Sequence, residues 1–138
     1  MTQPREVVFA SKLFQDWLDA LKQRALLQTH NQSYAMFRAV LHVLRRHMTT
    51  EQVLTFADAL PPLPRGIFIE EWRPANPLPV KSANEFVSEV IRDLAPHHVP
   101  PDTIAADVFA VLAERSYVRN VRILREQIPD PLKSLWPQ

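Results

Sequence analysis

The sequence predicts an all-α protein built from two similar multi-helix units. Apolar side chains recur at helical spacing along most of the chain, and proline clusters separate the helical stretches. A shift of 68 positions also aligns residues 40–68 with residues 108–136 without a gap, placing Val40 on Val108, Leu41 on Phe109, Val43 on Val111 and Leu44 on Leu112. Because one such unit cannot bury its apolar face alone, we expect an internal duplication with pseudo-twofold symmetry in one helical domain, 1–138.

The first repeat unit is predicted over about residues 7–72. Its first helix should run from about Val7 to Leu26, because apolar residues recur there every four positions, at Phe9, Leu13, Trp17 and Leu21. The stretch 27–33 is polar and predicts a loop, with Asn31 or Ser33 as the N-cap of the next helix. The apolar face of that second helix is marked by Phe37, Val40, Leu41, Leu44 and Met48.

Two further helices complete this unit. Thr49 and Gln52 have the spacing of a capping box, which predicts the start of a third helix that runs to Leu60. Pro61 and the prolines that follow end this helix, because proline lacks a backbone N–H. A short fourth helix is predicted from Pro64 to Trp72.

Prolines between residues 73 and 82 predict a stiff, extended connector. The second repeat unit follows over about residues 83–136 and should repeat the same order of elements. It comprises a helix capped by Asn84, a helix capped by Asp102, a helix over Tyr117–Gln127 and a short turn over Leu132–Trp136.

Composition excludes several classes of chemistry. The chain has no Cys, and therefore neither a disulfide nor a thiolate that serves as nucleophile or metal ligand. A single Gly excludes the glycine-rich loops of P-loop and dinucleotide-binding proteins. The formal net charge of +1 gives no reason to expect a nucleic-acid partner. Without a leader sequence or a long apolar run, we expect a cytoplasmic protein that makes no membrane contact.

The most distinctive cluster is Arg65-Gly66, followed by Phe68 and Trp72. A Gly after a proline-rich bend allows a positive φ or a close backbone approach, and Arg65 would then present its guanidinium fork to a carboxylate or phosphate. Arg65, Phe68 and Trp72 are therefore the predicted partner-binding residues. The alternative is structural, with Arg65 paired to Glu70 or capping helix carbonyls while both aromatic rings pack in the core.

The other polar clusters predict no chemistry. Arg38, His42 and Arg45 form a basic stripe that we interpret as a solvated helix face rather than a phosphate-binding surface. The histidines lack the helical i, i+4 spacing that favours a metal, and the neighbouring Glu70 and Glu71 diverge if they lie on a helix. We therefore expect no catalytic residue, no cofactor and no metal site, and we do not expect an enzyme.

Several segments together carry a family resemblance. They are Phe37–Arg45, Ala59–Pro61, Arg65–Pro74, Val121–Pro129 and Leu135–Pro137. These segments resemble the bacterial domain-of-unknown-function family 2267. The sequence departs from the family's usual residues at Arg46, where Asp is usual, and at Glu71, where Gly is usual. The resemblance implies a small helical bacterial protein and no established activity.

The leading functional hypothesis is a non-catalytic helical module that binds a protein partner or a second copy of itself. It rests on the aromatic side chains and on the lack of catalytic motifs, and Trp17, Trp72 and Trp136 are the expected interface residues because Trp is enriched in binding hot spots. The alternative hypothesis is a small-molecule or metal-binding protein with its pocket between the two helical units.

Overall fold

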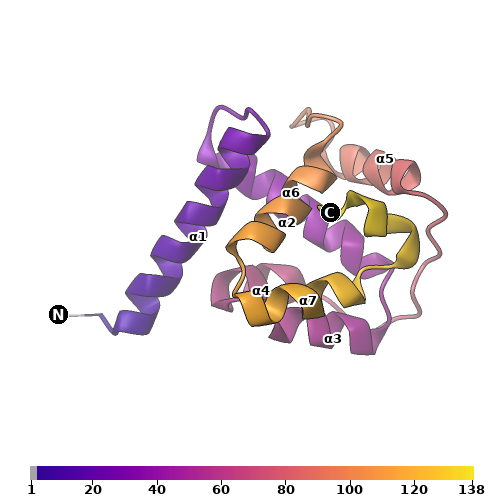
Figure 1. Ribbon diagram of the computed structural model, residues 1–138. Helices are drawn as coiled ribbons and strands as arrows, with labels where there is room; N and C mark the ends of the chain where they lie inside the picture. The colour runs from indigo at the N-terminus through magenta and orange to yellow at the C-terminus, as the bar shows by residue number, and fades with distance from the viewer. Residues whose placement is uncertain (1–2) are drawn as a thin grey trace.

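The computed structural model describes residues 3–138, and every regular element in that range is helical (Figure 1). The predicted all-α class is therefore confirmed. The elements are α1 (Arg5–Arg24), α2 (His30–Arg46), α3 (Thr50–Asp58), α4 (Pro62–Ile69), α5 (Ala83–Leu94), α6 (Ile104–Arg115), α7 (Val118–Gln127) and the 3-10 helix η1 (Asp130–Leu135).

Helix α2 lies at the centre of the fold, between α1 on one side and α5 on the other (Figure 1). It packs against α1, α4, α5 and α6, and its inner side chains are fully buried, among them Phe37, Val40, Leu41, Val43 and Leu44. Helix α6 buries the run Val108–Leu112 in the same core. Since each buried apolar side chain contributes about 1.5–3 kcal/mol, these two helices supply much of the driving force for folding.

Side-chain caps fix the starts of α2, α3 and α5, and those of α2 and α5 differ from the prediction. The capping box of Thr49 and Gln52 forms as expected. A second capping box, of Thr29 with Gln32, starts α2 inside the stretch predicted as a loop, so neither Asn31 nor Ser33 is the N-cap. The buried Ser33 hydroxyl instead donates to the Leu18 carbonyl, 2.7 Å away, and so joins α2 to α1.

Three more predicted boundaries are wrong by a few residues. Helix α4 spans Pro62–Ile69 rather than Pro64–Trp72, because Pro61 is its N-cap and Pro62 fits the first helical position, where no N–H bond is lost. Ser82, not Asn84, caps α5 by accepting a hydrogen bond from the Glu85 N–H. Thr103 rather than Asp102 precedes α6.

Residues 73–82 form no regular element and run from α4 to α5 (Figure 1). Their backbone is joined to the end of α2, where the Leu78 N–H donates to the Arg46 carbonyl at 2.9 Å. The imidazole of His47 bridges this segment to α5, since its Nδ1 lies 2.8 Å from the Leu78 carbonyl and its Nε2 lies 2.7 Å from Glu89.

The first helix contains one clear departure from the expected core. Phe14, Trp17 and Leu21 are buried against the body, but Phe9, which continues the same apolar stripe, is 56% exposed. The reason is visible in Figure 1, where the N-terminal turns of α1 project beyond the other helices. The apolar periodicity therefore predicts the helix correctly, but it does not show which turns of the helix pack against another helix.

Replacing Glu71 by glycine is expected to stabilise the fold. Glu71 has a φ of 57°, in the left-handed region where a Cβ atom costs about 1–2 kcal/mol. Glycine removes this cost, but its more flexible unfolded chain lowers the stability of the folded state by about 0.5–1 kcal/mol. The net result should be a free energy of unfolding that is about 0.5–1 kcal/mol higher. Urea denaturation measures the change. Glu71→Ala, which keeps the Cβ atom, should show no comparable gain, and an equal gain in both variants would contradict the explanation.

Candidate functional site

Arg65 is part of a helix cap. Its Nε donates to the Ala57 carbonyl at 2.9 Å, and its Nη2 donates to the carbonyls of Asp58 and Leu60 at 3.2 and 2.8 Å. These carbonyls lie at and just beyond the C-terminal end of α3, where few backbone N–H groups remain to pair with them; the Ala57 carbonyl also accepts from the Leu60 N–H at 3.1 Å. The predicted pairing of Arg65 with Glu70 does not form, because Glu70 binds Arg38.

The glycine beside Arg65 has neither of the predicted properties. Gly66 lies within α4, no glycine in the described part of the chain has a positive φ, and no atom lies within 4 Å of the position that a Cβ would occupy. Neither left-handed backbone nor close packing therefore requires a glycine here.

The two aromatic residues of the predicted site lie in different environments. Phe68 is completely buried, and its ring centroid lies 4.8 Å from that of Phe56. Trp72 is partly buried against the core and lines a surface pocket. Arg65, Phe68 and Trp72 thus do not form one exposed surface, and Trp72 is the member of the set that borders a pocket.

The Trp72 pocket has a volume of about 340 Å³ and is rich in arginine. Arg45 and Arg46 come from the end of α2, while Arg73 follows Trp72 in the connector. The pocket is completed by Met48, Glu71, Ala75, Asn76 and Leu78. The C-terminal end of α2 and the start of the connector therefore enclose a hollow with guanidinium groups and an indole ring on its walls.

The basic stripe on α2 binds the end of α4, which corrects its interpretation as a solvated face. The Arg45 Nη1 donates to the carbonyls of Phe68 and Glu70, at 2.8 and 2.7 Å. The His42 Nε2 lies 2.7 Å from the Ile67 carbonyl, and Arg38 forms an ion pair with the Glu70 carboxylate. Positive charge is favourable at this place, because the C-terminal carbonyls of a helix carry partial negative charge.

Lowering the pH from 7 to 5 should destabilise the protein partly through His42. Burial, together with the charges of Arg45 and Arg38, lowers the pKa of His42 below its usual 6.5, although the hydrogen bond to Ile67 opposes this shift. The folded state therefore favours the neutral ring. The contribution of His42 to stability is present above about pH 6.5 and is lost as the pH falls through the lowered folded-state pKa.

The variant His42→Gln isolates this effect, because its amide N–H keeps a donor for the Ile67 carbonyl but does not titrate. Thermal unfolding at several pH values should show a shallower loss of stability below pH 6.5 for the variant than for the natural protein. Parallel curves for the two proteins would contradict the role given to His42.

Many of the remaining polar residues form ion pairs or helix caps. Within residues 3–138, no three His, Asp or Glu side chains are grouped so that they could hold a metal ion. Asp107 is the buried carboxylate of α6, and burial raises its pKa while a hydrogen bond of 2.8 Å from the Thr103 hydroxyl opposes the rise. No helix of the described chain is long and apolar enough to cross a membrane.

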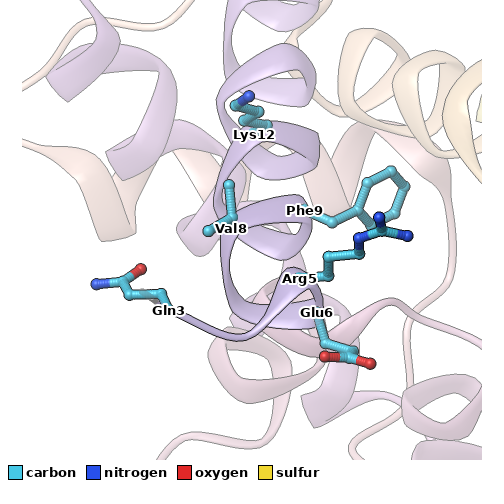
Figure 2. A pocket seen from close by; sticks show the side chains of 6 residues that line it. All are labelled: Gln3, Arg5, Glu6, Val8, Phe9 and Lys12. Atoms are coloured by element: carbon cyan, nitrogen blue, oxygen red, sulfur yellow. The ribbon is translucent and has the colours of Figure 1, made fainter. Parts of the chain in front are cut away.

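A second surface, at the N-terminal end of α1, was not found from the sequence. Val7, Val8 and Phe9 are 53%, 38% and 56% exposed. Figure 2 shows Val8 on one side of the helix and Phe9 on the other, beside a hollow of about 540 Å³. Arg5 and Lys12 lie near them. The apolar periodicity placed Phe9 on the stripe expected to face the core, so only the tertiary structure identifies it as surface.

The fold and these two surfaces define a small all-helical protein with an exposed apolar helix end and an arginine-lined pocket. The family model described as "Uncharacterized conserved protein (DUF2267)" matches residues 14–135. The chain therefore belongs to this family, the domain-of-unknown-function family 2267, and the resemblance of its motifs is confirmed. No curated protein matches the chain. The matched range begins at Phe14, the first buried residue of α1.

Proposed function

We propose that this protein is a non-catalytic protein-binding module that presents the first turns of α1 to a partner. The observation that carries the proposal is the exposure of Val7, Val8 and Phe9 on a helix end that projects from the body (Figure 1). Several exposed apolar side chains on one short stretch of helix favour an interaction surface, because water solvates them poorly. We call these three residues the α1 tip.

The shape of the α1 tip favours a partner with an apolar groove. Val8 and Phe9 point to different sides of the helix in Figure 2, so one flat surface would not cover both. A groove that surrounds a short helix covers several of its sides at once and uses a few apolar anchors. Three side chains also offer less area than the roughly 1,200 Å² of a standard interface between flat surfaces.

The double variant Val8→Ser/Phe9→Ser tests this proposal. Leu54→Ser is the matched control, since Leu54 is 55% exposed on α3, away from the α1 tip. We would use the natural protein, the double variant and the control in turn to isolate bound proteins from the source cells. Native mass spectrometry then compares the masses of the three recovered complexes. We expect a stoichiometric partner with the natural protein and the control, and its loss from the double variant.

Equal recovery of the same partner by all three proteins would overturn the proposal, as would a bare monomer in every sample. A doubled mass that disappears only in the double variant would identify the partner as a second copy of the chain. In that case the groove that receives the α1 tip lies on the second copy of the chain.

The single variant Phe9→Ser should remain as stable as the natural protein. Because Phe9 is largely exposed, its replacement should change the free energy of unfolding by no more than about 0.5 kcal/mol. Urea denaturation measures the difference. A loss of several kcal/mol would place Phe9 in the core of the protein in solution and remove the basis of the α1 tip.

We also infer that the body of the protein arose by internal duplication with pseudo-twofold symmetry. The order α2, α3, α4 corresponds to α6, α7, η1 when the sequence is shifted by the same 68 positions. Corresponding side chains are buried in both halves, such as Val40 with Val108 and Phe68 with Trp136. On this proposal α1 corresponds to α5, only the first turns of α1 remain available for a partner, and the role of the protein is binding without catalysis.

A further inference from the structure

The Trp72 pocket contains arginine side chains with unused hydrogen-bonding capacity. Within residues 3–138, Arg45 donates side-chain hydrogen bonds only from Nη1, to the carbonyls of Phe68 and Glu70. Arg73 is exposed and forms no side-chain hydrogen bond or ion pair within the same residues. Arg46 differs, because both its terminal nitrogens bind Asp93, at 3.2 and 2.7 Å. Arg45 and Arg73 are therefore the two cations of the pocket that form no ion pair with a carboxylate within these residues, and both have N–H donors left for a ligand.

The local charge at this pocket is positive. Burial lowers the pKa of Arg45, and the charges of Arg38 and Arg46 lower it further, while Glu70 and Glu71 oppose the shift. Three arginines and one glutamate line the pocket. Such a place favours a negatively charged ligand, which would relieve the repulsion between the cations.

The backbone beside the pocket is held in a costly conformation. Glu71 takes a left-handed φ of 57° directly before Trp72 and Arg73. Residues in sparsely populated backbone regions cluster at ligand sites, where the strain positions neighbouring groups. Here the turn at Glu71 brings Trp72 and Arg73 to the same hollow as Arg45.

From these observations we propose that the Trp72 pocket binds a small organic phosphate that carries a planar ring. The guanidinium groups of Arg45 and Arg73 would bind the phosphate, because their fork of N–H donors matches its oxygens and two cations match a dianion. The indole of Trp72 would contact the ring. This site shares no residue with the α1 tip, so it stands independently of the proposed protein-binding role.

Titration calorimetry with AMP at low salt tests the proposal, with adenosine as the ligand that keeps the ring but lacks the phosphate. AMP should bind at least about tenfold more tightly than adenosine, since charge-assisted hydrogen bonds carry the affinity. Arg73→Gln should weaken AMP binding by a similar factor. Arg119→Gln makes the same change of charge on α7, which does not line the pocket, and should leave binding unchanged.

A third variant uses the one acid that lines the pocket. Glu71→Gln removes a negative charge and should tighten AMP binding several-fold. No binding of AMP at millimolar concentration, equal binding of AMP and adenosine, or equal weakening by Arg73→Gln and Arg119→Gln would overturn the proposal. Inorganic phosphate that binds as tightly as AMP would overturn the contact between Trp72 and the ring.

Discussion

Replacing Phe68 by alanine is expected to lower the free energy of unfolding by about 3–5 kcal/mol, the usual range for a phenylalanine removed from a core. Phe68 is completely buried, and its ring packs against that of Phe56. The loss combines the transfer of the ring from the core to water with the cavity that remains, because the surrounding helices relax only in part. Urea or guanidinium denaturation, followed by circular dichroism, measures this change.

Leu63→Ala is the matched control on the same helix. Leu63 is 42% exposed, and the loss of its side chain should cost no more than about 1 kcal/mol. If Phe68→Ala were as mild as Leu63→Ala, the interpretation of Phe68 as a core residue would be wrong, and its predicted role in partner binding would regain support.

Removing the guanidinium of Arg65 is expected to have the second largest effect. In Arg65→Met the apolar stem is retained, but the carbonyls of Ala57, Asp58 and Leu60 lose their common donor. An unsatisfied buried polar group costs about 1–3 kcal/mol; the partly buried Leu60 carbonyl loses its donor, while the Ala57 carbonyl keeps the Leu60 N–H. The free energy of unfolding should therefore fall by about 1–3 kcal/mol, which the same denaturation experiment measures.

Two further variants separate the cap from a general effect of charge. Arg65→Lys keeps the positive charge but has no planar fork, so it should restore only part of the stability. Lys133→Met removes a cation that forms a surface ion pair with Asp130 and should cost less than about 1 kcal/mol. If Arg65→Met were as stable as the natural protein but had lost partner binding, the result would instead support the binding role predicted for Arg65.

Periodicity predicted the helices of this protein well wherever the apolar residues face the core. The pattern of Phe37, Val40 and Leu44 gave α2 because these side chains meet neighbouring helices on one face. The same reasoning failed at Phe9, since a helix has the same sequence pattern whether its apolar face meets its own body or a partner. Whether a patterned turn is covered is decided by tertiary packing.

The details of the two sites were predictable only in part. A cation that caps helix carbonyls was one of the two structural roles expected for Arg65, and that role is confirmed, although its carbonyls belong to α3. The Trp72 pocket was not predicted as a whole, because Arg45 and Arg73 meet only after the chain turns at Glu71. Glutamate itself does not mark a left-handed turn, since glycine and asparagine are the residues that usually do, and the one signal was that the family resemblance has Gly at position 71.

The connector between α4 and α5 has a consequence for limited proteolysis of this protein. Residues 73–79 are exposed and form no helix, so a protease has access to the backbone there. A cut after Ala75 would separate α1–α4 from α5–η1, yet α2 packs against α5 and α6, and α3 packs against α7. The two fragments would therefore stay together as a nicked, folded pair. Each fragment would cover the apolar face of the other, so a cut here is expected to leave the fold intact.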